Sequence, residues 1–166
     1  MYILFVCTGN TCRSSMAEGI FKYMIKEKNI ENIHVSSAGI STFEGESANE
    51  KAIRTLAGKG IDISNHRSRQ LTKQIISESD LILTMTLRHK KIIVDAAPEY
   101  SDRVYTLKEF ALIINGEETE RKNLDIADPY GLNYNVYESS AKEIEEQLNI
   151  IVNNIQITIE EQWRKK

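Results

Sequence analysis

YILFVCTGNTCRSSMAEGI, residues 2–20, is the stretch that decides the fold of this chain. Its first five residues are a continuous apolar run, which is typical of a parallel strand buried on both faces. Residues 7–14 are small and polar. The next apolar residues share one face of a helix: Met16, Ala17, Ile20 and Met24. The stretch therefore predicts a strand, a polar loop and a helix, in that order.

The same alternation continues along the chain. Apolar segments predict three further strands, at residues 33–39, 81–85 and 103–107. Short amphipathic segments predict helices at residues 47–56, 72–78 and 87–94. A last helix is predicted from apolar residues three or four positions apart: Tyr137, Ala141, Ile144, Leu148, Ile151, Ile155 and Ile159.

Strands that alternate with helices predict an α/β fold with a mainly parallel sheet. The chain has 166 residues, and we expect a single domain over residues 1–166. Residues 111–125 are rich in Asn, Gly, Glu and Lys, so a surface excursion is expected there. Sites in such folds lie outside the carboxyl ends of the strands. The loop at residues 7–14 lies at such an end.

Composition excludes several classes of protein. Hydrophobic residues are 41% and charged residues 27% of the chain, the balance of an ordinary globular protein. The net charge of −3 argues against nucleic-acid binding, and we interpret the basic run at residues 88–91 as a solvated helix face. The sequence contains no apolar run of the roughly 20 residues that a membrane span needs. Residues 1–6 do not have the pattern of a signal peptide.

The two cysteines, Cys7 and Cys12, are too few for a disulfide framework. Together with the widely spaced His34, His66 and His89 they form no recognisable metal pattern. We therefore expect no metal site and a reducing, cytoplasmic environment.

The loop at residues 7–14 fits the pattern Cys-x5-Arg-Ser. Backbone N–H groups in a tight loop and the start of a helix together attract a phosphate group. Gly9 allows backbone geometry that other residues avoid, and Arg13 can donate to two phosphate oxygens. Cys7 would lie where a positive field favours the thiolate, which is a nucleophile for phosphoryl transfer. The simpler interpretation is a buried cysteine and a solvated arginine.

A leaving group needs a proton, so an acid is expected near the loop. Asp128 is the best candidate, because Pro129 would stiffen the segment that presents it. Tyr130 could form a wall of the cleft. The simpler interpretation of Asp-Pro is an ordinary turn.

With these residues in place, the sequence resembles the low-molecular-weight protein tyrosine phosphatase family over nearly its whole length. Shorter motifs support the resemblance: Met16-Ala17-Glu18, Ser37-Ala38-Gly39, Gly60-Ile61, His66, Ser68-Arg69-Gln70 and Asp80. The resemblance implies a four-stranded parallel sheet flanked by helices, no cofactor, and phosphorylated protein substrates. It also implies that Cys7 attacks phosphorus while Asp128 protonates the leaving group, and that water then hydrolyses the phosphocysteine.

The resemblance assigns further roles around the loop. Arg13 would hold the phosphate oxygens together with the loop residues Thr8, Gly9, Asn10, Thr11 and Cys12. Ser14 would stabilise the Cys7 thiolate, and Ser37 and His66 would support Asn10 from behind. Cys12 could form a reversible disulfide with Cys7 under oxidation, or could be a small packing residue.

Thr11 bears on the substrate. Tyrosine phosphatases of the family usually carry a larger aliphatic residue there, and the threonine loop resembles the bacterial protein-arginine phosphatase branch. A planar, polar guanidinium needs polar neighbours when enclosed. Gly131 follows Tyr130, which leaves one aromatic wall where many eukaryotic members have two. We predict hydrolysis of protein phosphoarginine; hydrolysis of phosphotyrosine, with Thr11 a neutral variant, is the alternative.

Two other functions are less consistent with the sequence. An arsenate reductase of this fold needs two further cysteines on another segment, and the chain has none outside the loop. A phosphate-binding module without turnover would not need Cys7, Arg13 and Asp128 together. We expect a monomer, because the sequence contains no coiled-coil seam or large apolar stripe. For the reasons given above, we expect it to bind neither nucleic acid nor membranes.

Overall fold

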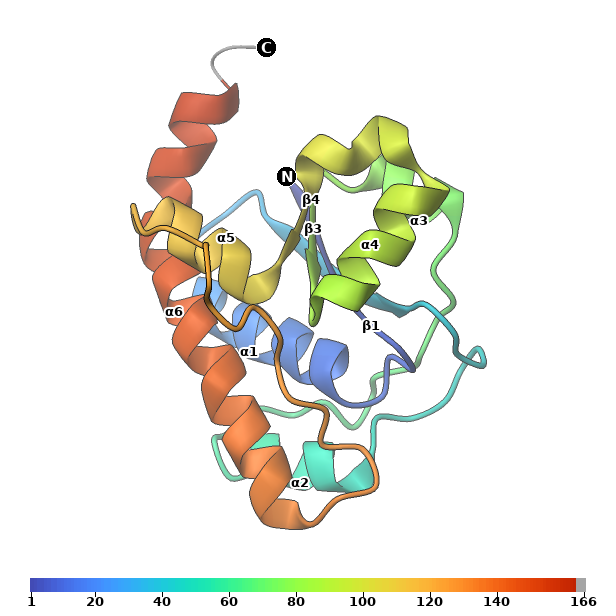
Figure 1. Ribbon diagram of the computed structural model, residues 1–166. Coiled ribbons are helices and arrows are strands. Elements are labelled where there is room, and N and C mark those ends of the chain that lie inside the picture. The colour runs from blue at the N-terminus through green and yellow to red at the C-terminus, as the bar shows by residue number, and fades with distance from the viewer. Residues whose placement is uncertain (164–166) are drawn as a thin grey trace.

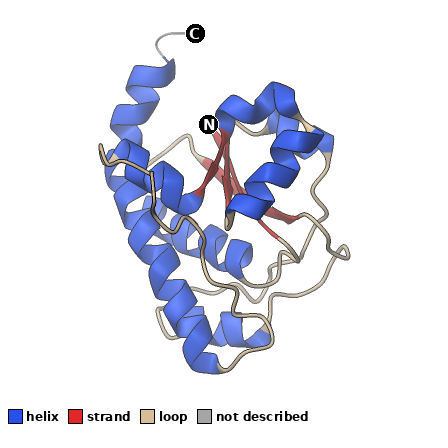
Figure 2. Ribbon diagram, viewed as in Figure 1, coloured by secondary structure: helices blue, strands red, loops and turns tan. Residues whose placement is uncertain are grey.

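The fold is built on a four-stranded parallel sheet with strand order β2-β1-β3-β4. A computed structural model describes residues 1–163, and the side chains of residues 1–155. The strands are β1 (Tyr2–Cys7), β2 (His34–Gly39), β3 (Leu81–Thr84) and β4 (Val104–Thr106). The predicted sheet, with helices on both faces, is confirmed (Figures 1 and 2).

Helices cover the sheet in two layers (Figure 1). One layer contains α1 (Arg13–Glu27), α2 (Glu50–Ala57), α5 (Leu107–Ile114) and α6 (Tyr134–Trp163). The other contains α3 (Lys73–Glu78), α4 (Leu87–Ala96) and the 3₁₀ helix η1 (Pro98–Arg103). No helix within residues 1–163 is both long and apolar enough to cross a membrane.

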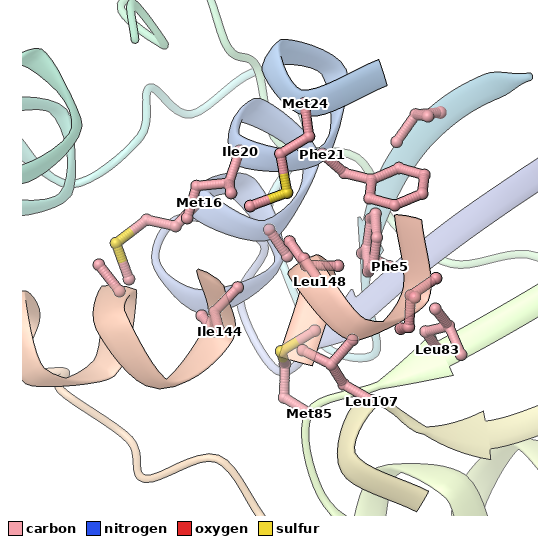
Figure 3. Packing of buried hydrophobic residues seen from close by; sticks show 14 of the residues in the cluster. Phe5, Met16, Ile20, Phe21, Met24, Leu83, Met85, Leu107, Ile144 and Leu148 are labelled. Carbon is pink, nitrogen blue, oxygen red and sulfur yellow. The ribbon is translucent and has the colours of Figure 1, made fainter. Parts of the chain in front are cut away.

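Strand β1 is buried on both faces from Ile3 to Cys7, which explains its apolar sequence, whereas Tyr2 at its start is exposed. Phe5 packs into the larger core between the sheet, α1 and α6, where its ring meets Phe21 edge-on (Figure 3). Leu4 and Val6 point to the opposite side, into a smaller core that includes Ile93 of α4. Because β1 is fixed on both sides, the loop after Cys7 starts from a rigid position.

The prediction of a surface excursion at residues 111–125 was wrong for its first residues, 111–114. Residues 107–114 form helix α5, which begins with a capping box between Thr106 and Glu109. Phe110 and Ala111 are buried against the larger core, and this apolar burial outweighs the polar composition of the adjoining segment. The chain is buried again at Leu124 and rejoins the larger core at Ile126.

Several boundaries also differ from the prediction. Helix α2 begins at Glu50 rather than at residue 47, because the Asn49 side chain accepts a hydrogen bond from the N–H of Lys51 and caps it. The last helix begins earlier than predicted, at Tyr134. The side chain of Ile159, predicted to share its apolar face, lies outside the described side chains.

Candidate active site

The Cys7 sulfur lies at the end of the central strand, where the loop to α1 begins. Its Sγ is 2.9 Å from Ser14 Oγ, and the Asn10 backbone N–H donates to it over 3.3 Å. Asn10 has a φ of 56°, a left-handed conformation that lets the loop turn back toward the sulfur. A thiolate at this position would accept hydrogen bonds from both groups.

The Asn10 side chain is fully buried and forms the frame of the loop. Its Nδ2 donates to Ser14 Oγ (2.9 Å) and to Ser37 Oγ (2.8 Å), while its Oδ1 accepts from the Arg69 backbone N–H (3.0 Å). Because Ser14 Oγ accepts from Asn10, its own hydroxyl proton is free to be donated to Cys7 Sγ.

Glu18 and His66 support this frame from behind. Ser37 Oγ donates to Glu18 Oε2 (2.5 Å), and His66 Nε2 lies 2.7 Å from the Asn10 carbonyl oxygen. The sequence motifs placed Ser37 and His66 here but gave Glu18 no role. The available signal was spacing, because Glu18 comes four residues after Ser14 on the same helix and so shares its face.

We expect Asn10→Gly to keep the left-handed backbone but to weaken the loop. The substitution removes three buried side-chain hydrogen bonds, so the free energy of unfolding should fall by about 2–4 kcal/mol. Phosphate release should fall about tenfold or more, because the Ser14 hydroxyl is no longer directed to Cys7. Urea unfolding and steady-state kinetics would measure both effects.

Asn29→Gly is the matched control, because Asn29 also has a left-handed φ, of 52°, but is exposed at the end of α1. Equal stability losses in the two variants would show that the Asn10 side chain does not frame the loop.

Arg13 connects the loop to the segment that carries Asp128. Its side chain is almost fully buried; Nη1 donates to the Ile126 carbonyl oxygen (3.0 Å) and Nη2 to Asp128 Oδ2 (2.8 Å). The Asp128 side chain is half-exposed, and its Oδ1 accepts from the Tyr130 backbone N–H (3.1 Å). A nucleophile, a cation and a carboxylic acid from distant parts of the chain therefore meet at one place.

These groups open onto a cleft of about 350 Å³. Most of the predicted site residues line it: Cys7, Thr8, Gly9, Thr11, Cys12, Arg13, Asp128 and Tyr130. The others lie behind the loop: Asn10, Ser14, Ser37 and His66. Phe43, an exposed aromatic side chain that also lines the cleft, was not predicted from the sequence. Its signal was a large apolar residue in a polar segment just after β2.

A larger cavity of about 640 Å³ lies on the far side of the frame, where Glu18, Ser37, His66 and Arg69 contribute to its lining. It contains no cysteine, whereas the smaller cleft contains the Cys7 sulfur, and the smaller cleft is therefore the candidate active site. Within the described residues, no group of three or more His, Cys, Asp or Glu side chains is placed to hold a metal ion.

Cys12 differs from Cys7 in its surroundings. Its Sγ lies 3.4 Å from the hydroxyl of the fully buried Tyr137, and both cysteines are free thiols. Burial raises the pKa of the Cys12 thiol, with smaller opposing effects from its hydrogen bonds to Tyr137 and Thr11. Cys12 therefore stays protonated at neutral pH and does not compete with Cys7 as a nucleophile. A disulfide between them under oxidation stays a prediction.

The basic run at residues 88–91 was predicted to be a solvated face, and this is wrong for His89. Lys91 is exposed and Lys90 pairs with Glu109, but His89 is buried with its Nε2 2.9 Å from Thr8 Oγ1. An amphipathic helix directs part of each short run of residues toward the core. Because the neighbours of His89 are all basic, the sequence did not show that this residue is the one that is buried.

Known proteins resemble this chain along most of its length. The family described as low molecular weight phosphotyrosine protein phosphatase matches residues 2–161. The chain is 39% identical over 148 residues to the protein-arginine-phosphatase of Bacillus subtilis (strain 168), covering 89% of this chain and 92% of the relative. It is 35% identical over 143 residues to the probable low molecular weight protein-tyrosine-phosphatase EpsP of Ralstonia nicotianae, covering 86% and 88%.

A solved structure of the YwlE arginine phosphatase, a mutant with a phosphorylated active-site serine, superposes with a TM-score of 0.85. It is 34% identical in sequence, and the match covers 100% of both chains. With a match of this extent to the family and to its members, the chain belongs to the low molecular weight phosphotyrosine protein phosphatase family.

Proposed function

We propose that this chain is a cysteine-dependent protein phosphatase that hydrolyses protein phosphoarginine through a phosphocysteine intermediate. The observation that carries the proposal is the meeting of Cys7 Sγ, the Arg13 guanidinium and the Asp128 carboxyl group at one cleft. The relatives named protein-arginine-phosphatase, and the mutant with a phosphorylated active-site serine, support the substrate and the intermediate. The phosphatase domain would comprise residues 1–166.

In the first step the Cys7 thiolate attacks phosphorus and the P–N bond breaks. The bonding electrons go to the guanidine nitrogen, which takes the proton of Asp128. Arg13 and the loop N–H groups would bind the three equatorial oxygens, whose charge is stabilised by donors fixed in advance. Arg13 Nη2 donates to Asp128 in the free enzyme, so the group that binds phosphate also positions the acid.

In the second step water attacks the phosphorus of the phosphocysteine. Asp128, now a carboxylate, takes a proton from the water, the P–S bond breaks and the Cys7 thiolate is restored. Ser14 favours this departure, because its hydroxyl lies 2.9 Å from the sulfur that regains negative charge.

The preference for phosphoarginine rests on Thr11 and Asp128. Thr11 lines the cleft next to Cys12, and its hydroxyl supplies a polar wall for a guanidinium. Asp128 can contact the guanidinium through one carboxyl oxygen while it protonates the leaving nitrogen through the other. An isoleucine at position 11 would place an apolar side chain against a polar group.

We expect Thr11→Ile to reverse the substrate preference. The catalytic efficiency with a phosphoarginine peptide should fall about 10- to 100-fold, because the guanidinium loses a polar partner in the cleft. The efficiency with a matched phosphotyrosine peptide should stay the same or rise. Phosphate release from both peptides would be measured for each enzyme.

Two further variants separate size from polarity at this position. Thr11→Val keeps the shape and removes the hydroxyl, whereas Thr11→Ser keeps the hydroxyl in a smaller side chain. If polarity decides, only Thr11→Val loses phosphoarginine activity. A wild-type enzyme that prefers phosphotyrosine would contradict the arginine assignment and favour the alternative, a protein-tyrosine phosphatase with the same cysteine mechanism.

The surroundings of the enzyme belong to the same proposal. Two free cysteines are consistent with a reducing compartment, so we place the protein in the cytoplasm, acting as a monomer on phosphorylated proteins. Gel filtration with light scattering would test the monomer.

A further inference from the structure

His89 is a buried imidazole directly behind the active-site loop, and the two-step mechanism does not use it. It lies in the first turn of α4, where its backbone N–H donates to Oγ1 of the N-cap residue Thr86 (3.2 Å). Its side chain is 5% exposed, and its Nε2 lies 2.9 Å from Thr8 Oγ1. Thr8 is the neighbour of the nucleophile and lines the cleft.

The other ring nitrogen decides which atom carries the proton. Nδ1 of His89 is buried and has no hydrogen-bond partner among the described residues. Burial, followed by the charge of Arg13, lowers the pKa of His89 to about 4, so the ring is neutral at neutral pH. A neutral imidazole carries one proton, and a buried N–H without an acceptor is rarer and more costly than a bare acceptor. The proton is therefore on Nε2, which donates to Thr8 Oγ1.

This donation fixes the direction of the Thr8 hydroxyl. Because Thr8 Oγ1 accepts a hydrogen bond from behind the loop, its own proton must point to another acceptor. The exposed side of Thr8 faces the cleft, which Cys7 and Arg13 also line. A phosphoryl oxygen bound there is the acceptor that the chemistry supplies.

We propose that His89 is a positioning residue that fixes the Thr8 hydroxyl as a hydrogen-bond donor to the phosphoryl group in the cleft. The proposal rests on the proposed phosphatase function. A donor oriented before the reaction stabilises the charge of the transition state without reorganisation. His89 does this as a neutral group, so it adds no charge that would hold the product phosphate.

Kinetics of a double-mutant cycle test the coupling. His89→Leu and Thr8→Val should each lower kcat/KM about 5- to 50-fold, and the double variant should be no less efficient than the weaker of the two. His89→Gln should recover much of the activity, because its amide N–H can donate to Thr8. His34→Leu, on an exposed histidine at the start of β2, is the control and should match the wild type.

Losses that multiply in the double variant would overturn the proposal, as would a folded His89→Leu enzyme with wild-type kcat/KM. Thermal unfolding of each variant identifies those that are folded.

A second measurement needs no variant. Imidazole ¹⁵N–¹H NMR of the wild-type protein should show His89 protonated on Nε2, and protonation on Nδ1 would overturn the proposal. Titration with inorganic phosphate separates this result from the proposed function. If the wild type hydrolyses neither phosphopeptide but Thr8→Val and His89→Leu weaken phosphate binding equally, the proposed function fails and the pairing stands. If neither variant weakens phosphate binding, the pairing fails.

Discussion

Replacing Cys7 with serine is expected to abolish phosphate release, with kcat at least about 10⁴-fold lower than in the wild type. A serine hydroxyl is a much weaker nucleophile toward phosphorus than the cysteine sulfur that it replaces. The serine is nearly the same size and can keep the contacts with Ser14 and the Asn10 N–H. Binding of inorganic phosphate, measured by calorimetry, should therefore survive while turnover with a phosphoarginine peptide is lost.

Cys12→Ser is the matched control, because it also replaces a thiol by a hydroxyl, five residues along the same loop. Its sulfur contacts the Tyr137 hydroxyl, and a serine there can still form a hydrogen bond. This variant should keep at least about a tenth of the wild-type kcat. Loss of turnover in Cys12→Ser with a fully active Cys7→Ser enzyme would contradict the assignment of the nucleophile.

Removing the Arg13 guanidinium is expected to have the second-largest effect. Arg13→Ala should lower the catalytic efficiency about 10³- to 10⁴-fold, because a buried, charged donor to the phosphoryl oxygens is lost. Arg13→Lys keeps the charge but not the two-pronged geometry, so it should recover only part of the activity. Phosphate binding should weaken in both variants, unlike in Cys7→Ser.

Arg103→Ala provides the control for the loss of an arginine that donates to a backbone carbonyl. Arg103 donates to the Ser79 carbonyl oxygen in the other helical layer, as Arg13 donates to Ile126. It should lose stability comparably while its activity stays at the wild-type level. An Arg13→Ala enzyme with the same activity as Arg103→Ala would remove Arg13 from the site.

The features that could be predicted from the sequence are those encoded locally. The apolar run of β1, the small polar loop and the apolar face of α1 each show in consecutive residues. Helix α5 was not predicted, because its last apolar residues are followed directly by a polar segment. The polar composition of that segment made the helical spacing of the apolar residues hard to recognise. Where a helix ends depends on what its last turn can bury, and that partner lies elsewhere in the chain.

The parts of the site that were not predicted from the sequence depend on contacts between distant segments. Thr8 and His89 are 81 positions apart, and Cys12 and Tyr137 are 125 apart. No pattern within one segment distinguishes a buried histidine of α4 from its solvated neighbours. By contrast, Asp128 was predicted to lie near the loop because the proposed chemistry requires an acid there. The spacing of apolar residues gave no information about this position.

The active-site loop is held from both layers of the protein, by Asn10 and its partners on one side and by His89 on the other. Ordering a backbone costs roughly 1–2 kcal/mol of conformational entropy per residue. In this protein the loop is already ordered when the chain folds, so phosphate binding requires little further loss of backbone entropy. The heat of phosphate binding should thus report the new hydrogen bonds themselves, since the backbone that donates them is already in place.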